Sequence, residues 1–219
     1  MSSSNHDGPG SKFTAQGVRE YERRRYRGID QRIVHAREVR LIKKFIAIVR
    51  KTGNGKALGP FLDMPCGYGR FTELLRSGGA ALVDGDLSQE MVRRAGAKSG
   101  IPGVVANAKQ GLPFKNGVFG IVFSIRFFHH LHDPEDRDAV LREFSRVSSG
   151  WVVISFYRMN GFHRLQRKIR RMLNKSRTNI RMIERGRFEQ EAKAAGLTPV
   201  SVKPLFRGLH AYHLALLKK

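Results

Sequence analysis

The sequence predicts an α/β fold in which a doubly wound, mostly parallel sheet of seven strands carries helices on both faces and an antiparallel hairpin at one edge. Two observations carry this prediction. Apolar runs alternate with segments of helical periodicity through residues 57–157, and this alternation is typical of a parallel sheet with crossover helices. The last two apolar runs, within 198–219, are separated by a short connection, which favours an antiparallel pair.

The expected elements follow one another in a regular order. Apolar side chains at helical spacing predict a first helix over 30–51, and the glycine-containing turn at 52–56 ends it. Strands are then expected at 58–64, 81–86, 103–108, 120–125, 151–156, 198–206 and 210–219, with helices at 70–77, 88–98 and 135–147.

Composition predicts one domain with extensions. The chain has 219 residues and 41% apolar content, enough to bury a single core. Residues 1–12 are expected to be a disordered tail, 13–56 a basic helical cap, and 57–219 the main domain with a basic helical insertion at about 158–187. No apolar run approaches the ~20 residues of a membrane helix, and a cytoplasmic location is expected. The lone Cys66 excludes an internal disulfide.

The net charge of +23 is concentrated in two flanks. Residues 11–56 hold 14 Lys and Arg against 4 Asp and Glu, residues 158–187 hold 11 against 1, and the stretch between them is nearly neutral. Such flanks favour an anionic partner, which can be nucleic acid, a membrane face or a phosphorylated substrate. In the second flank a predicted helix separates apolar from basic side chains, a pattern typical of helices on anionic surfaces and also of a packed lid. Its basic face includes Arg164, Arg167, Lys168 and Arg171.

A glycine-containing loop follows the first expected strand in FLDMPCGYGRFTELL, residues 61–75. Gly67 and Gly69 stand where an open α/β sheet binds its ligand, and glycine lets the backbone approach a nucleotide-like group closely. An isolated Gly-x-Gly also occurs in plain turns. However, Asp86 ends the next strand 23 residues after Asp63, a spacing that agrees with a ribose-binding carboxylate.

Together these segments resemble the class I S-adenosylmethionine-dependent methyltransferases, especially the branch near the ubiquinone and menaquinone biosynthesis enzymes. The matching motifs, in the family's order and spacing, are LDMPCGYGRFTELL, DGDLSQEMV, ANAKQGLPFKNGVFGIVFS, HHLHDPE and EAKAAGL. The resemblance implies a Rossmann-like fold, methyl transfer as the activity and S-adenosyl-L-methionine as the cofactor. The chain departs from the family at Pro65, where glycine is usual, and at Gly120, where Asp is frequent.

The resemblance also implies a set of cofactor-binding residues. Asp63 would hold the amino acid end of the cofactor, Asp86 would bind the ribose, and Leu87 and Met91 would contact the ring. Asn107 would stand at the adenine edge, where its amide oxygen can accept a hydrogen bond from the adenine amino group. The full set is Asp63, Pro65, Cys66, Gly67, Gly69, Asp86, Leu87, Met91, Asn107 and Ala108.

The acceptor site is expected at the end of the fourth strand, in SIRFFHHLHDP. Arg126 and His129 are the candidate catalytic residues, because a histidine can act as a base near neutral pH if the acceptor must lose a proton. The alternative is that the histidines end the strand and pack the following turn, which we favour for His130 and His132. No carboxylate or cysteine stands at a supporting local spacing, so no metal site is predicted.

Three functions remain open. The first is a methyltransferase for a small or lipid-linked, anionic acceptor, met at the inner face of a membrane. The second is an RNA methyltransferase, favoured by charge, although the chain lacks the Asn/Asp-Pro-Pro-aromatic loop of enzymes that act on exocyclic base nitrogens. The third is a non-catalytic RNA- or membrane-binding protein on the same scaffold, which retention of Asp63, Gly67 and Asp86 argues against. We favour the first function.

Overall fold

The structure is a computed structural model that describes residues 29–53, 58–101, 103–159, 181–206 and 211–219. The tail predicted at 1–12, the first part of the cap predicted at 13–56 and most of the basic insertion predicted at about 158–187 lie outside these ranges.

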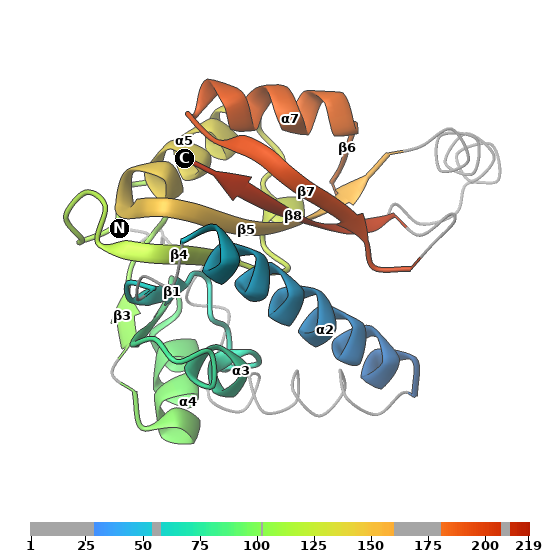
Figure 1. The fold of residues 1–219 in the computed structure, drawn as a ribbon. Coiled ribbons are helices and arrows are strands. Elements are labelled where there is room, and N and C mark those ends of the chain that lie inside the picture. Colours follow the sequence, from blue (N-terminus) through green and yellow to red (C-terminus); the bar gives the residue numbers. More distant parts are fainter. Residues whose placement is uncertain (1–28, 54–57, 102, 160–180, 207–210) are drawn as a thin grey trace, which may run out of the picture.

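A single mixed sheet forms the centre of the molecule (Figure 1). Its strand order is β3-β2-β1-β4-β5-β8-β7, in which the first five strands are parallel and β8 runs antiparallel between β5 and β7. This confirms the predicted path of seven strands and its antiparallel edge hairpin. The strands are β1 (Phe61–Asp63), β2 (Leu82–Asp86), β3 (Gly103–Val105), β4 (Phe119–Ser124), β5 (Ser148–Arg158), β7 (Thr198–Pro204) and β8 (Tyr212–Lys218).

One short strand was not expected from the sequence. β6 (Met182–Ile183) pairs in parallel with the end of β5, at Tyr157 and Arg158, so the described sheet has eight strands. Two residues carry too little periodicity to be recognised in a sequence.

Helices cover both faces of the sheet (Figure 1). One face carries α2 (Ile29–Thr52), α3 (Thr72–Arg76) and α4 (Gln89–Ser99), and the other carries α5 (Pro134–Val147) and α7 (Arg185–Ala194). The short 3-10 helix η1 (Phe128–His130) follows β4.

β4 is apolar on both of its faces because helices cover both. Ile121 and Phe123 belong to the core beneath α2 and α3, while Val122 belongs to the core beneath α5 and α7. Neighbouring side chains of a strand point to opposite faces, so a doubly covered central strand needs a continuous apolar run.

α2 buries one of its faces and exposes the other. Its apolar face, with Ile42, Phe45 and Val49, is buried in the core, and burying each such side chain is worth about 1.5–3 kcal/mol. The seven Lys and Arg side chains of α2 are all exposed. Tertiary packing therefore fixes how this helix lies on the sheet.

Backbone packing accounts for the glycine at position 120, where the resembling family frequently has aspartate. A Cβ atom on Gly120 would lie 2.7 Å from the backbone nitrogen of Gly59, because the two backbones touch at the start of β4. The aspartate that is frequent in the resembling family would not fit here, and the contact lies at the opposite end of β4 from Arg126.

Candidate active site

The carboxyl ends of β1, β2 and β4 frame a pocket of about 140 Å³. β1 lies between β2 and β4, so the pocket lies where the strand order reverses, which is the usual ligand position in an open α/β sheet. The lining residues come from the loop after β1, from β2 and α4, and from the end of β4: Pro65, Cys66, Gly67, Tyr68, Arg70, Phe71, Asp86, Met91, Ile125, Arg126 and His130.

The two loop glycines do different things. Both have positive φ, +56° for Gly67 and +78° for Gly69, in the region that favours glycine. A Cβ atom on Gly67 would meet nothing within 4 Å, whereas one on Gly69 would lie 3.0 Å from Cα of Ala95 in α4. Gly67 thus leaves room beside the pocket, and Gly69 allows α4 to pack closely on the loop.

Asp86 ties this loop to β2. Its Oδ2 accepts a hydrogen bond from the backbone nitrogen of Gly67 (3.0 Å), and its Oδ1 accepts one from the backbone nitrogen of Ser88 (2.9 Å). The backbone of Leu87 also contributes a hydrogen bond, and a carboxylate has about four acceptor positions, so the side chain can still accept from a ligand. Burial raises the pKa of Asp86, although the amide hydrogen bonds from Ser88 and Gly67 act against the rise.

Asp63 ends β1 and is buried, with 1% of its surface exposed. Its Oδ2 has no hydrogen-bond partner among the described residues, and the side chain does not line the pocket. Burial raises its pKa well above the ordinary value, and the nearby charges of Asp84 and Asp86 raise it further. A buried carboxyl in this position favours its neutral form until a donor or a cation reaches it.

The remaining predicted cofactor residues divide between pocket, surface and core. Met91 lines the pocket and packs with Tyr68. Leu87 lies on the turn between β2 and α4, where 39% of its surface is exposed. Ala108 is buried in the core, so its side chain is not available to a ligand. The amide oxygen of Asn107 already accepts a hydrogen bond from the backbone nitrogen of Lys109 (3.0 Å).

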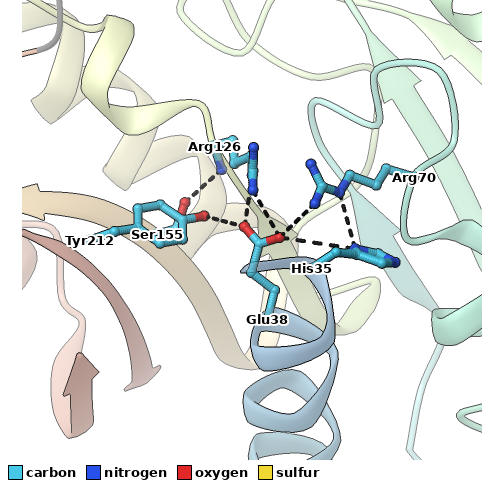
Figure 2. A network of polar contacts seen from close by, with 6 residues as sticks. All are labelled: His35, Glu38, Arg70, Arg126, Ser155 and Tyr212. Carbon is cyan, nitrogen blue, oxygen red and sulfur yellow. Dashed lines mark hydrogen bonds and ion pairs between the residues drawn. The ribbon is translucent and has the colours of Figure 1, made fainter. Parts of the chain in front are cut away.

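A buried polar cluster meets the other side of the pocket (Figure 2). Its centre is Glu38 of α2, with 0% of its surface exposed. Oε1 of Glu38 accepts hydrogen bonds from Nε of Arg126 (2.7 Å) and the hydroxyl of Tyr212 (2.9 Å). Oε2 accepts from Nη2 of Arg126 (3.1 Å) and forms an ion pair with Nη2 of Arg70 (3.0 Å).

The pKa shifts in this cluster follow from its geometry. Burial opposes the charge of Arg126, but the hydrogen bond and the charge of Glu38 outweigh it and raise its pKa. Burial and the charge of Glu38 raise the pKa of Tyr212, which keeps the hydroxyl proton that it donates. Burial and the charge of Arg70 lower the pKa of His35, whose Nδ1 accepts a hydrogen bond from Nε of Arg70 (3.1 Å).

The two neighbouring histidines lie in different environments. His129 is 5% exposed, and its ring packs between those of His130 (4.1 Å between centroids) and Tyr157 (4.9 Å). His130 is exposed and lines the pocket, whereas His129 does not. Successive residues of a 3-10 helix point about 120° apart, so only one of the pair faces the pocket. The sequence analysis names His129 as a candidate base and favours a packing role for His130.

Sequence reasoning missed Glu38 and Arg70, and it assigned His130, which lines the pocket, to a packing role. One signal was available for Glu38, because it is an acidic residue on the otherwise apolar face of a predicted amphipathic helix. A charge at such a position is buried with a partner or belongs to a site. Arg70 follows the glycine loop directly, but its direction could not be read from the sequence.

The described part of the chain shows neither a metal-binding cluster nor a membrane-spanning helix. No group of His, Cys, Asp and Glu side chains there is arranged to hold a metal ion. No helix within the same ranges is long and apolar enough to cross a membrane.

An open α/β sheet with a glycine loop and a carboxylate at its switch point defines a nucleotide-cofactor-binding class of protein. Residues 62–154 match the family model described as a methyltransferase domain, and the motifs of this stretch resemble those of the class I S-adenosylmethionine-dependent methyltransferases. S-adenosyl-L-methionine is accordingly its methyl donor, as the sequence predicted.

Solved structures share the fold at low sequence identity. A magnesium protoporphyrin IX methyltransferase from Synechocystis with bound S-adenosylhomocysteine is 16% identical, with a TM-score of 0.73 over 96% of this chain and 97% of that chain. A possible histamine N-methyltransferase from Thermotoga maritima is 18% identical, with a TM-score of 0.62 over 94% and 97%. A TehB-like methyltransferase from Corynebacterium glutamicum is 19% identical, with a TM-score of 0.63 over 94% and 100%. No curated protein matches the chain.

Proposed function

We propose that the protein transfers the methyl group of S-adenosyl-L-methionine to a small or lipid-linked acceptor that carries an anionic group. The observation that carries this proposal is a single pocket lined by Gly67 and Asp86 on the cofactor side and by Arg126 and His130 at the end of β4. A methyl donor and an acceptor must meet in one site, and these residues supply both halves of it.

The residues present fit the cofactor. Gly67 leaves open space at the loop, Asp86 keeps acceptor capacity for a ribose hydroxyl, and Met91 offers an apolar wall. Asp63, with its unpartnered Oδ2, would accept from the amino acid end directly or through a water. When bound, the cofactor supplies an electrophilic methyl group on a positively charged sulfur. The enclosed 140 Å³ is smaller than the ~300 Å³ or more of typical ligand pockets, so such a ligand extends beyond these walls.

The reaction class is tested with labelled S-adenosyl-L-methionine and three fractions of a cell extract: lipids, RNA and small metabolites. We expect label in the small-metabolite or lipid fraction. Label in RNA alone would replace this acceptor class with nucleic acid. If calorimetry found that the unmodified protein binds neither the cofactor nor its demethylated product, the enzyme proposal would fail.

The two histidines give a matched test of the acceptor side. If His130 takes a proton from the acceptor, His130→Ala should lower turnover by on the order of a hundredfold and leave cofactor affinity nearly unchanged. His129→Ala is the control, because His129 is buried away from the pocket. A larger loss of turnover in the His129 variant, with the fold intact, would restore the prediction made from the sequence.

The exposed face of α2 supports an anionic surface as partner. Its seven basic side chains fall on one face of the helix, opposite the buried apolar face, and the acidic Glu38 lies on the buried side. We call these residues the α2 basic face: Arg32, Arg37, Arg40, Lys43, Lys44, Arg50 and Lys51. The one Phe of α2 is buried and the helix has no Tyr or Trp, so this face offers no platform for stacking bases. We therefore favour an anionic lipid surface over RNA.

Vesicle binding tests this partner. Replacing Arg40, Lys43 and Lys44 with Gln should weaken binding to vesicles that contain phosphatidylserine, because each basic side chain contributes about 1 kcal/mol at an anionic membrane. The matched control replaces three exposed arginines on other helices, Arg93, Arg142 and Arg185. Equal binding by the two variants would remove the α2 basic face from the proposal. Binding to RNA but not to such vesicles would make nucleic acid the partner.

A further inference from the structure

One nitrogen of the Arg126 guanidinium group has no hydrogen-bond or ion-pair partner among the described residues. Nε and Nη2 of its guanidinium group both donate to Glu38, and Figure 2 shows a nitrogen of the group pointing away from that carboxylate. Within the described ranges, no hydrogen bond or ion pair uses Nη1. The side chain is 16% exposed and lines the pocket beside Gly67 and Asp86. A largely desolvated donor with a positive charge therefore faces the place where methyl transfer would occur.

The backbone of Arg126 is held in an unfavourable conformation. Its φ is +62°, and it is the one non-glycine residue of the described chain with positive φ. A residue with a long side chain adopts this region at an energetic cost, which surrounding contacts must offset. Here the backbone nitrogen donates to Oγ of Ser155 (2.6 Å), and the side chain is held by Glu38. Both contacts maintain a turn that directs the guanidinium group into the pocket.

The guanidinium group is also fixed in its orientation. Glu38 receives it in a two-pronged hydrogen bond, and the ring of Tyr212 lies 5.9 Å from its central carbon. A planar donor that is already oriented loses little further freedom when it binds a second partner. Glu38 is buried and is shared with Arg70, so it does not belong to Arg126 alone. The arrangement suits a planar oxyanion arriving from the pocket.

We propose that Arg126 forms an anion subsite, in which Nη1 donates to a carboxylate or phosphate of the methyl acceptor while Glu38 acts as the positioning residue. This deepens the proposed function and rests on it, since it names the group by which the acceptor is held. A carboxylate could come from the acceptor or from the cofactor's own amino acid end, and the experiment must separate these two sources.

The first arm measures the subsite without an acceptor. The protein loaded with S-adenosylhomocysteine is melted in inorganic phosphate and in chloride at equal ionic strength. We expect phosphate to raise Tm in a saturable way, because a ligand of the folded state stabilises it. Arg126→Gln should lose this increase, and Arg142→Gln, which removes the same charge from an exposed site on α5, should keep it. If Arg126→Gln keeps it too, phosphate is an adventitious ion only and the subsite is refuted.

The second arm measures transfer and cofactor binding together. Labelled methyl should enter the metabolites retained by an anion-exchange resin, and Arg126→Gln should reduce that transfer by about tenfold to a hundredfold, as expected for a lost charged hydrogen bond. Affinity for S-adenosylhomocysteine should stay within about twofold. An equal fall in that affinity would assign Arg126 to the cofactor's carboxylate, and label only in unretained metabolites would exclude an anionic acceptor. Either result overturns the proposal.

Failure of the proposed function and failure of the anion subsite give different results. If no fraction accepts methyl, the proposed function fails while the phosphate arm still decides the subsite. If Arg126→Gln does not fold, Arg126→Lys keeps the charge beside Glu38 but lacks the second donor group, and it should lose the phosphate-dependent increase in Tm. A lysine variant with the full increase would contradict the role of Nη1.

Discussion

The two sides of the pocket differ in their ionisable groups: carboxyl groups lie at or behind one side, and guanidinium groups line the other. On the side of β1 and β2, the buried carboxyls of Asp63, Asp84 and Asp86 lie near one another, and burial raises the pKa of each. On the side of α2 and β4, the guanidinium groups of Arg70 and Arg126 share the carboxylate of Glu38.

This difference matches the chemistry of the two molecules that must meet. The methyl donor carries a sulfonium and an ammonium group and presents ribose hydroxyls, all of which suit carboxyl groups. Guanidinium groups instead suit the carboxylate or phosphate proposed for the acceptor. The halves also differ in origin: the cofactor half comes from one stretch of about 30 residues, whereas Glu38 reaches Arg126 and Tyr212 across 88 and 174 positions of the chain.

The largest effect is expected when the cluster on the guanidinium side of the pocket is disrupted. Glu38→Ala removes the carboxylate from Arg126 and Arg70, and leaving a buried ion partner unpaired costs about 3–5 kcal/mol of unfolding free energy. Urea unfolding of the cofactor-free protein measures this loss. Glu135→Ala, at the exposed start of α5, is the control and should lose only a few tenths of a kcal/mol. A Glu38 variant as stable as this control would show that the cluster is not a structural clamp.

A smaller effect is expected when the carboxyl side of the pocket is disrupted. Asp86→Ala should weaken binding of S-adenosylhomocysteine by about 1–3 kcal/mol, since hydrogen bonds from the ribose to a charged acceptor are lost and the Gly67 loop is released from β2. Calorimetry gives the affinity, and circular dichroism should show an unchanged fold. Arg126→Gln should leave the same affinity nearly intact. If the two variants weakened binding equally, the division of the pocket into two halves would be wrong.

The smallest expected effect is a change in how the unfolding free energy depends on pH. The folded-state pKa of Asp63 is raised, so its contribution to stability is fully present below the unfolded value of 3.8 and is lost as pH rises through the folded value. Asp63→Asn cannot ionise and should make the decline in unfolding free energy with rising pH less steep in the cofactor-free protein. Asp138→Asn, on the surface of α5, should leave the slope unchanged. Equal slopes for wild type and Asp63→Asn would show that Asp63 ionises without penalty.

Most of the fold, and the position of Gly67 and Asp86 at one pocket, could be predicted because their signals are local. The alternation of apolar strands and amphipathic helices determined the sheet, and Gly67 and Asp86 stand at strand ends that a parallel sheet brings to one edge. Positions at strand ends need no knowledge of distant contacts. Asn107 and Ala108 show where this reasoning weakens, because the local turn engages the amide oxygen of one and the core buries the other.

The sequence by itself thus determined the class of fold, the methyl donor and the position of the glycine loop at the end of β1. The tertiary structure decided that Glu38 lies beneath Arg70 and Arg126, and that His130 rather than His129 lines the pocket. The physical reason is that these arrangements depend on how α2 packs across the sheet and on the phase of a single 3-10 turn. A buried charge chooses its partners among side chains from distant parts of the chain, and no local periodicity records that choice.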